Sequence, residues 1–336
     1  MGKVARQSIT IEDVAREAGV SRQTVSRAVN GKGEISEATR RRVLAVADRL
    51  GYRPSLIARS LATRSSRTIG LVMPDIANPF FPEIARGAGE AAYGLGYQLF
   101  LSNTAEDSAR EWSILRSLEE QWVAGLILCS SRLSDEQLIE VSRRQAPLLL
   151  FNREVEGADV ASLLVDDAGG AYAMMAHLVS AGHREIGLLL GPARSWSGMR
   201  RHEAYCARLK EAGIAVSDNR VVHGAPDVDG GRQAMAQLLA QSPDISAVFA
   251  YNDLMALGAM QACGEAGRRV PDDCAIAGCD DIPLAALATP ALTTVNVDKT
   301  ATGRRAMDML YGIIAGAEGS PRRELMPARL VVRESA

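Results

Sequence analysis

The chain is poor in several residue types that metal sites and membrane spans use. It has four histidines and five cysteines, scattered without a CxxC pair or a Cys/His cluster, and only fifteen aromatic residues in 336. No apolar run approaches the about 18 residues of a transmembrane helix, and the N-terminus lacks the apolar stretch of a signal peptide. We therefore expect reduced thiols, no metal site, no membrane span and a cytoplasmic location.

Motifs of enzyme chemistry are missing as well. No GxxxxGK[ST], HExxH or GxSxG sequence occurs. Gly87-Ala88-Gly89 lies inside a helical pattern rather than after a strand, so it does not fit a dinucleotide fingerprint. Asp166–Asp167 and Asp280–Asp281 are neighbours along the chain, and such side chains point apart more often than they form a catalytic dyad. We expect no catalytic residues, no cofactor and no enzymatic activity.

Charge is unevenly distributed along the chain. Residues 1–67 contain fourteen Lys or Arg against six Asp or Glu, a charge of +8, whereas the remaining residues contain 24 against 34, a charge of −10. The net charge of −2 therefore conceals a basic N-terminal module on an acidic body. This division favours a polyanionic partner for that module alone. With 47% hydrophobic residues, the body can bury large cores and suits two or three domains.

The segment Thr10–Asn30 predicts two helices joined by a turn that contains Gly19. Thr10 and Ser21 are suitable N-caps, and Gly19 suits the end of the first helix. A short glycine-containing turn between two helices is typical of a helix-turn-helix, whose second helix enters the DNA major groove. Arg and Gln side chains pair there with base edges. An ordinary two-helix corner is the alternative. The outward face of the second helix carries Arg22, Gln23, Ser26 and Arg27.

Two following segments strengthen the DNA-binding interpretation. Ser36 is a suitable cap for a third helix over 37–50, and Arg40–Arg42 near its start oppose the helix dipole, a cost that DNA phosphates offset. After Pro54 comes a short helix-capable basic segment that ends near Leu61. The residues expected on the buried face of the third helix are Val43, Leu44, Val46, Ala47 and Leu50.

From about Thr68 onward, short β-rich runs alternate with helical stretches, which predicts parallel sheets with βαβ connections. We expect a first set of strands at 69–73, 98–101, 125–128 and 148–151, and a second set at 161–165, 186–190, 221–222, 247–250, 275–278 and 292–295. The predicted fold class is an N-terminal all-α helix-turn-helix domain followed by an α/β domain of two lobes, each a doubly wound parallel sheet. Such sheets bind ligands at strand carboxyl ends, so the crevice between lobes is the expected site.

The chain resembles the LacI/GalR (lactose repressor) family of bacterial transcriptional regulators. The match runs in family order from about residue 10 to the last residue. The sequences that carry it are DVAREAGVSRQTVSRAVNG, SEATRRRVLAVADRLGYRP, ARSLATR, IGLVMPDIANPFF, FNRE, GHREIGLLLGP, YNDLMALGA, GCDDIPLAALATPALTTV and RLVVRES.

The resemblance implies a domain organisation. Residues 1–53 would form the DNA-binding head, 54–67 a hinge helix and linker, and 68–336 a periplasmic-binding-protein-like domain for effector binding and dimerisation. Its chain would cross between lobes three times, with the N-lobe at about 68–160 and 296–325 and the C-lobe at about 161–295 and 326–336. A homodimer would bind palindromic double-stranded operator DNA. Because no leucine heptad follows the last predicted strand, we expect a dimer rather than a tetramer.

The resemblance also implies two sets of site residues, with Leu61 as a minor-groove wedge. The DNA-binding set is Thr10, Ser21, Arg22, Gln23, Thr24, Ser26, Arg27, Asn30, Ser36, Thr39, Tyr52, Ala58, Arg59 and Leu61. The effector-binding set is Asp75, Asn78, Phe80, Phe81, Asn152, Arg153, Ser197, Arg201, Asn252 and Asp280. Alternatives stay open at three positions: Phe80 as an ordinary core residue, Asp280 as a cap, and Trp196 as a stacking platform or a surface residue.

The interpretation is a transcriptional repressor of carbohydrate-utilisation genes whose operator binding depends on a small sugar-like effector. A nucleobase- or nucleoside-responsive member is the alternative, although the purine-responsive member has arginine at the position matching Ser195. A solute-binding transport protein would carry a secretory signal and no helix-turn-helix, and an architectural DNA binder would not need a polar crevice. Whether the effector induces or co-represses stays open.

Overall fold

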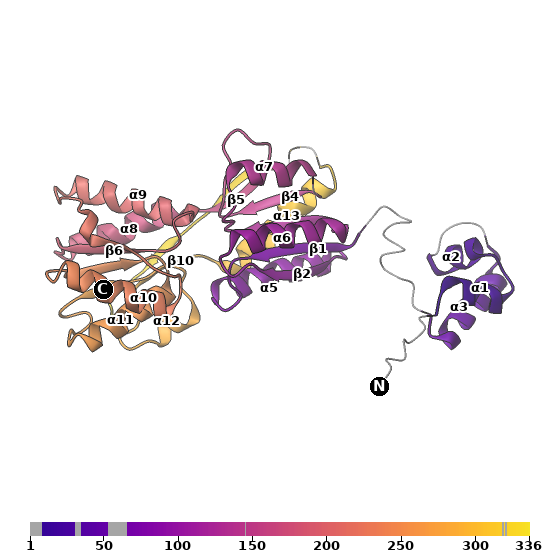
Figure 1. Ribbon diagram of the computed structural model, residues 1–336, viewed down its shortest axis with the longest axis horizontal. Coiled ribbons are helices and arrows are strands. Elements are labelled where there is room, and N and C mark those ends of the chain that lie inside the picture. The colour runs from indigo at the N-terminus through magenta and orange to yellow at the C-terminus, as the bar shows by residue number, and fades with distance from the viewer. Residues whose placement is uncertain (1–8, 31–34, 53–65, 145, 318, 320) are drawn as a thin grey trace. The chain divides into compact units, whose positions relative to one another are not determined.

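The computed structural model describes residues 9–30, 35–52, 66–144, 146–317, 319 and 321–336. The chain divides into two compact units, Met1–Ser66, here called the head unit, and Arg67–Ala336, here called the two-lobed unit. Both are drawn in Figure 1. The finer boundary expected at residue 53 borders residues outside this description and stays a prediction.

The described part of the head unit contains α1 (Ile11–Ala18), α2 (Arg22–Asn30) and α3 (Glu37–Leu50). Thr10 caps α1 in a capping box with Asp13, and Gly19 ends the helix in the left-handed region at φ 63°. The buried faces of the three helices meet in one small core formed by Val14, Ala15, Ala18, Val25, Ala28, Val43, Val46 and Ala47. The helices predicted from sequence are confirmed.

One position in α3 was predicted wrongly. Leu44 was expected to be buried, yet it is 43% exposed. The buried residues Val43, Val46 and Ala47 follow the i, i+3, i+4 spacing of one helix face, and Leu50, half-buried at i+7, packs against them. Leu44 lies about 100° around the helix from Val43, which places it off this stripe.

The first lobe of the two-lobed unit, the N-lobe, contains a six-stranded parallel sheet in the order β11-β5-β4-β3-β1-β2. Helices α5 and α13 cover one face, and α6 and α7 cover the other. The strands are β1 (Thr68–Met73), β2 (Gln98–Asn103), β3 (Gly125–Cys129), β4 (Leu148–Phe151), β5 (Ala161–Val165) and β11 (Arg323–Met326), and the helices are α5 (Phe80–Gly94), α6 (Ser108–Glu120), α7 (Asp135–Arg144) and α13 (Lys299–Ile314).

The second lobe, the C-lobe, contains a four-stranded parallel sheet in the order β7-β6-β8-β9. Helices α8 and α9 cover one face, and α10, α11 and the short α12 cover the other. The strands are β6 (Ile186–Leu190), β7 (Val221–His223, after a 3-10 turn at Asp218–Arg220), β8 (Ala247–Ala250) and β9 (Ala275–Ala277), and the helices are α8 (Asp167–Ser180), α9 (Trp196–Glu211), α10 (Val228–Gln241), α11 (Asp253–Glu265) and α12 (Pro283–Leu287).

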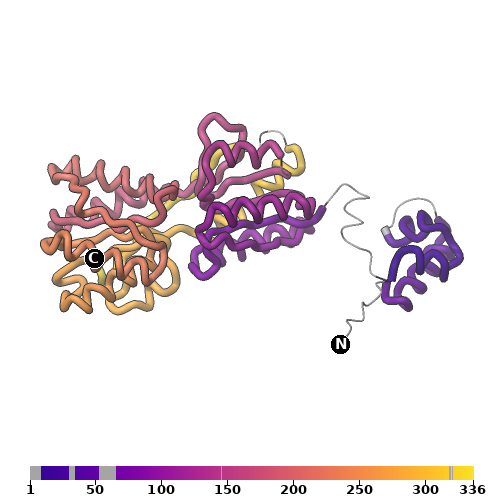
Figure 2. Tube along the Cα trace, in the orientation of Figure 1, coloured from indigo at the N-terminus to yellow at the C-terminus, as the bar shows by residue number. Residues whose placement is uncertain are grey.

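The chain passes between the lobes three times, after β5, after β10 (Thr294–Asn296) and after β11. Figure 2 traces these passages. Strand β10 pairs antiparallel with β12 (Arg329–Val331) in a separate two-stranded ribbon. One lobe boundary was predicted wrongly: β5 was assigned to the C-lobe, but it pairs with β4 and β11 in the N-lobe sheet. The first crossing therefore follows Val165 rather than residue 160.

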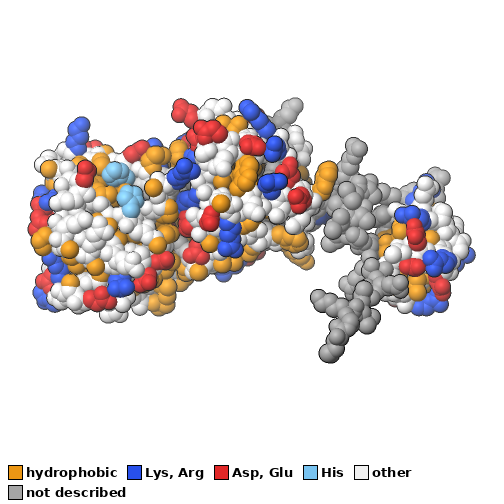
Figure 3. All heavy atoms as spheres, in the orientation of Figure 1, with side chains coloured by type: hydrophobic (Ala, Val, Ile, Leu, Met, Phe, Trp, Pro, Cys, Tyr) orange, Lys and Arg blue, Asp and Glu red, His pale blue; other side chains and the backbone are white. Residues whose placement is uncertain are grey.

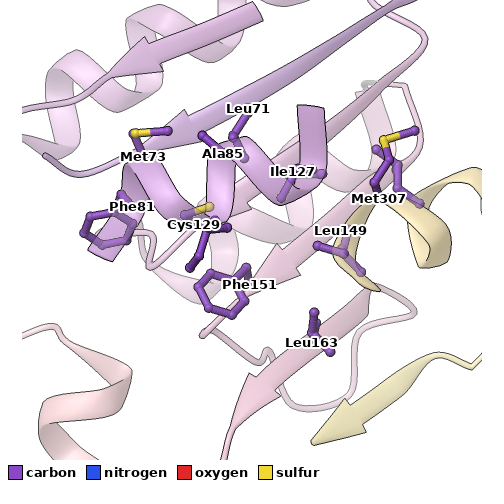
Figure 4. Close-up of a cluster of buried hydrophobic side chains, with 14 of the residues drawn as sticks. Leu71, Met73, Phe81, Ala85, Ile127, Cys129, Leu149, Phe151, Leu163 and Met307 are labelled. Atoms are coloured by element: carbon purple, nitrogen blue, oxygen red, sulfur yellow. The ribbon is translucent and has the colours of Figure 1, made fainter. Parts of the chain in front are cut away.

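The N-lobe core shows how closely its helices pack. In Figure 4, Phe81 and Ala85 of α5 face the sheet residues, and Met307 of α13 lies at the same core. Helices α5 and α13 meet at two glycines. A Cβ on Gly87 would lie 2.0 Å from the Thr300 carbonyl oxygen, and one on Gly303 would lie 2.0 Å from that of Ile84. Gly87 therefore serves helix packing.

Candidate functional site

The outward face of α2 carries three exposed polar side chains, Arg22, Gln23 and Arg27. The Arg22 guanidinium lies 2.8 Å from the Glu12 carboxylate of α1, and both side chains are more than half exposed. A solvent-exposed ion pair of this kind contributes little stability, so Arg22 can leave Glu12 for another partner at low cost. Ser21 caps the start of the helix by accepting from the backbone N–H of Thr24.

A second part of the head surface lies at the start of α3. The Ser36 hydroxyl accepts from the backbone N–H of the half-buried Thr39, and Ser36 lies at the surface with Arg41 and Arg42. Tyr52 is instead half-buried against the head core, where burial raises its pKa. Within the predicted DNA-binding set, Thr24 and Ser26 are half-buried, Asn30 ends α2 without a described side chain, and Ala58, Arg59 and Leu61 lie outside the described residues.

Between the two lobes lies a cavity walled by both of them. Its volume is about 30 Å³, which is room for one or two waters. The lining residues are Asn78, Phe80, Phe81, Glu106, Ser130, Arg132 and Asn152 from the N-lobe, and Ser197, Arg201, Pro226, Tyr251, Asn252 and Asp280 from the C-lobe side. Side chains therefore fill most of the crevice, and a ligand of sugar size needs the lobes or the side chains to move.

Two phenylalanines form the apolar wall of the cavity. Phe80 and Phe81 begin α5, and their rings meet edge to face at 5.2 Å between centroids and 88° between planes. Phe80 also stacks on Phe151 at 6.3 Å, and both rings are over nine-tenths buried. Phe80 and Phe81 thus belong to the N-lobe core and also line the cavity. For Phe80, the core alternative and the lining position are therefore both correct.

Arg201 lies on the C-lobe wall, where its guanidinium is hydrogen-bonded to other residues of the protein. Its Nε and Nη2 donate to one Asp167 carboxylate oxygen at 3.0 and 2.7 Å, and Nη1 donates to the Tyr251 carbonyl. Asp280 stands 3.7 Å from Nη2. Burial raises the pKa of Asp280 to about 7, although Arg201 and Lys299 oppose the shift. The cavity therefore contains a carboxyl group that titrates near neutrality.

The backbone at Asp280 is fixed by Lys299, which follows the crossing after β10. Asp280 and Asp281 have φ angles of 116° and 50°, in the region that favours glycine. The buried Lys299 at the start of α13 donates from Nζ to the carbonyl oxygens of both residues, at 2.7 and 2.9 Å. The capping alternative for Asp280 is not seen, because α12 begins after Ile282 without a side-chain cap.

Three asparagines of the predicted set line the cavity while holding loop backbone. Asn78 accepts from the Phe80 N–H at 3.0 Å, and Asn152, at φ 51°, accepts from the Val165 N–H at 2.9 Å. Asn252 caps α11 and donates to the Pro226 carbonyl. Each amide thus fixes the wall in place, as a binding site requires.

Two predicted effector residues lie away from the cavity lining. Asp75 accepts from the Ala77 N–H in an exposed turn. Arg153 pairs with Asp135, and its guanidinium carbon lies 5.9 Å from the ring centre of Trp196 at the start of α9. The other eight, Asn78, Phe80, Phe81, Asn152, Ser197, Arg201, Asn252 and Asp280, line this cavity together. Their part in binding stays a proposal.

Five lining residues were not predicted from the sequence: Glu106, Ser130, Arg132, Pro226 and Tyr251. Most of them follow a strand end, since Glu106 comes after β2, Ser130–Arg132 after β3 and Tyr251 after β8. The rule that ligands meet strand carboxyl ends, applied to every strand, finds these four. Pro226 follows β7 with no distinguishing signal of its own.

Comparisons with known proteins agree with this geometry. Residues 10–55 match the model of bacterial regulatory proteins, lacI family, and residues 175–336 match a periplasmic binding protein-like domain. The HTH-type transcriptional repressor PurR of Photobacterium profundum is 34% identical over 97% of this chain and 98% of its own. The chain belongs to the LacI family of bacterial regulatory proteins.

Two solved structures of transcriptional regulators have the same fold as this chain. The lac repressor dimer bound to operator and the anti-inducer ONPF aligns with a TM-score of 0.83 at 30% identity, over 98% of this chain and 99% of that one. The complex of the regulator CelR with cellobiose aligns at 0.75 and 33% identity, over 98% and 100%. This LacI-family chain is therefore a ligand-responsive DNA-binding transcriptional regulator with the predicted fold class.

Three further observations concern catalysis, membrane spans and the cysteines. The similar proteins PurR, CytR and GalR are named as HTH-type transcriptional repressors or regulators, not as enzymes. Among the described helices, none has the length and apolar character needed to cross a membrane. All five cysteines have free thiols, four of them buried.

Proposed function

We propose that this LacI-family regulator represses carbohydrate-utilisation genes by binding a palindromic operator in the cytoplasm, under the control of a sugar-like effector, and that it has no enzymatic activity. The observation that carries the proposal is the cavity between the lobes, lined by two phenylalanine rings on the N-lobe wall and by charged and amide side chains on both walls, in a chain with a helix-turn-helix. Aromatic faces suit the C–H side of a sugar, and paired polar groups suit its hydroxyls. The cellobiose complex of the similar CelR supports this assignment.

Effector control follows from the position of the cavity. Its walls come from both lobes, and Lys299, which follows the crossing after β10, contacts Asp280 of the lining. A ligand that contacts both walls binds one angle between the lobes better than others, which is the differential contact that allosteric control requires. Asp280 is the coupling point on the C-lobe side, because Lys299 joins its backbone to α13 of the N-lobe.

The operator contacts divide into two classes. Arg22, Gln23 and Arg27 would read base edges from α2, whereas Arg40–Arg42 would hold phosphates. Leu61 would act as a minor-groove wedge, in line with its place in the family hinge. Leu61→Ala should then reduce both operator affinity and DNA bending in a FRET assay, while leaving the oligomeric state unchanged. Unaltered bending would contradict the wedge.

A homodimer is part of the proposal, and the N-lobe surface supports it. Strand β2 is the edge of the six-stranded sheet, and its Phe100 and Leu101 are about half exposed. Tyr93 and Leu95, at the end of α5 that leads into β2, are also exposed. An apolar edge strand is a template for pairing with a second chain. On the visible face in Figure 3, by contrast, acidic and basic side chains are mixed.

A thermal-shift screen of the full chain tests the effector class. A ligand that binds the native state raises the melting temperature by mass action. Monosaccharides and disaccharides should raise it, and the Asp280→Asn variant should lose much of that response. Because the two phenylalanines would stack equally well on a base, nucleosides and nucleobases belong in the same screen. A response to nucleobases alone would favour the nucleobase-responsive alternative.

A further inference from the structure

Two charged side chains of the cavity, Glu106 and Arg132, form an ion pair on the N-lobe wall. Glu106 comes from the loop after β2 and Arg132 from the turn after β3. The Arg132 Nε lies 2.6 Å from Glu106 Oε2, and Nη2 lies 3.2 Å from Oε1, so the pair is bidentate. The Arg132 side chain is 6% exposed and that of Glu106 is 21% exposed.

The turn that carries Arg132 is fixed by a buried carboxylate. Glu111 of α6 accepts from the Arg132 backbone N–H at 2.9 Å and from the Ser131 hydroxyl. Ser131 in turn accepts from the Leu133 N–H at 3.2 Å, and Ser130 has a φ angle of 46°. The position of the Arg132 guanidinium is therefore set before any ligand arrives, which lowers the entropic cost of binding.

One nitrogen of the Arg132 guanidinium takes no part in the pair with Glu106. This nitrogen, Nη1, is buried and makes no hydrogen bond of good geometry among the residues that the structure describes, although the Tyr251 hydroxyl interacts with the guanidinium from across the cavity. Burial acts to lower the pKa of Arg132, but Tyr251 across the cavity and Glu106 outweigh it, so the group stays charged. A buried charged donor without an acceptor is costly, and an oxygen atom of a ligand in the cavity would satisfy it.

The two arginines among the described lining residues are both already paired with carboxylates. Arg132 is paired with Glu106, and Arg201 is paired with Asp167. Asp280 adds a carboxyl group on the opposite wall. A phosphate or carboxylate in this cavity would approach the Glu106 carboxylate, and Asp280 in its ionised form, while losing its own hydration, and both effects oppose binding. An uncharged ligand avoids both costs.

We propose that Glu106 and Arg132 together recognise two adjacent hydroxyl groups of an uncharged ligand. Arg132 Nη1 donates to one hydroxyl oxygen, and the free lone pairs of the Glu106 carboxylate accept from the neighbouring hydroxyl. The pair selects neutral vicinal diols and rejects phosphorylated or acidic analogues. This inference rests on the proposed function, because it assigns chemistry to the same cavity. The diol can belong to a neutral sugar or to the ribose of a nucleoside.

The test compares ligand pairs that differ in one group, by calorimetry on the full chain. The probes are galactose, glucose, ribose and adenosine, and the anions are glucose 6-phosphate and glucuronate. The partners are the 2-deoxy and the 3-deoxy form of each sugar, so that every vicinal diol of the ring is absent from at least one of them, and 2′-deoxyadenosine. Whichever diol binds the unaltered chain should bind at least tenfold more tightly than the deoxy partner that lacks the contacted pair of hydroxyls. Comparing the affinities of the sugars with that of adenosine shows whether the diol belongs to a neutral sugar or to the ribose of a nucleoside.

Two variants then assign the effect to the ion pair. Arg132→Met and Glu106→Gln should each weaken the diol probe about tenfold or more, and should change the deoxy partner less than threefold. Arg144→Met, which breaks a surface pair with Glu140 on α7, serves as the matched control and should change neither. Melting curves of each variant without ligand check that the fold is retained.

Several outcomes would overturn the inference, and they separate it from the proposed function. The diol assignment is wrong if Arg132→Met weakens the diol probe and its deoxy partner equally. It is also wrong if the unaltered chain binds an anionic probe more tightly than the neutral partner of that probe. If Asp280→Asn abolishes binding while Arg132→Met does not affect it, the cavity is the effector site and only this inference fails. If no probe binds the unaltered chain, both fail.

Discussion

Single residues in the crevice show that lining a cavity and contacting a ligand are different properties. Arg201 was predicted as a main ligand anchor, and three of its five N–H donors go to Asp167 and to the Tyr251 carbonyl. These bonds fix its guanidinium on the C-lobe wall, and its role as an anchor stays a proposal. Arg132, which the sequence interpretation did not include, has a buried nitrogen facing the cavity that makes no hydrogen bond of good geometry among the described residues. The residue type predicts the chemistry, and only the contacts show which donor is available.

The titration of Asp280 gives a pH-dependent prediction. Its pKa of about 7 lies above its ordinary value of 3.8, so the native state binds the proton more tightly than the unfolded chain does. The stability that this group contributes is complete below about pH 4 and is lost as the pH rises through 7. Between pH 6 and pH 8, a single group with these pKa values loses about 1.4 kcal/mol of unfolding free energy.

Urea unfolding of the unaltered chain and of Asp280→Asn, at pH 6 and at pH 8, measures this difference. The unaltered chain should lose stability relative to the variant by an amount of that order. Asparagine keeps the shape of the side chain without titrating, so titrating groups that do not interact with Asp280 cancel in the comparison. The measured difference therefore belongs to Asp280 together with its neighbour Asp253, whose pKa the Asp280 charge raises. An identical pH response in the two proteins would show that Asp280 does not titrate in this range.

The head surface gives a prediction about specificity. Arg22→Ala should cost about 1–3 kcal/mol on the cognate operator and relax the preference at one base pair, because a base contact is lost. Neutralising Arg40–Arg42 should weaken binding to all sequences and flatten the dependence on salt, because phosphate contacts are lost. Selection from randomised DNA followed by salt titration distinguishes the two. Equal losses on cognate and random DNA for Arg22→Ala would contradict the assignment.

At the scale of elements, most of the fold could be predicted from sequence because apolar periodicity is local. Strands β4, β5, β6 and β8 have the predicted bounds, and the three head helices are where their caps place them. The lobe to which β5 belongs could not be predicted. A fully buried strand has the same apolar sequence pattern in either sheet, and its pairing depends on residues far along the chain. The same limit applies to the cavity, whose wall combines several strand ends.

The contact between α5 and α13 yields a prediction about packing. Gly303→Ala places a methyl group 2.0 Å from the Ile84 carbonyl oxygen, so the helices must separate. We expect a loss of about 1–3 kcal/mol, as for other overpacked cores, and a lower melting temperature. Gly264→Ala in α11 is the matched control, because no atom lies within 4 Å of its added methyl group. That variant should be neutral or slightly stabilising, and equal behaviour of the two would contradict the packing role.

At the scale of the whole molecule, the proposed dimer couples the β2 surface to DNA binding. Phe100→Lys places a charge on the apolar edge strand and should shift the protein toward monomer in sedimentation velocity. Operator affinity should fall with it, because one head contacts only one half-site. Val216→Lys, at another exposed apolar position in the C-lobe, should change neither property. A dimer that survives Phe100→Lys would place the interface elsewhere.

The size of the cavity has a consequence for the speed of the response. A space of about 30 Å³ must enlarge before a sugar enters, so only the enlarged fraction of molecules is competent to bind. The apparent dissociation constant then exceeds the intrinsic one by the reciprocal of that fraction. Stopped-flow binding rates should level off at high sugar concentration, at the rate of enlargement. Such a plateau would show that the enlargement of the cavity, and not the encounter with the sugar, sets the rate at which the repressor takes up its effector.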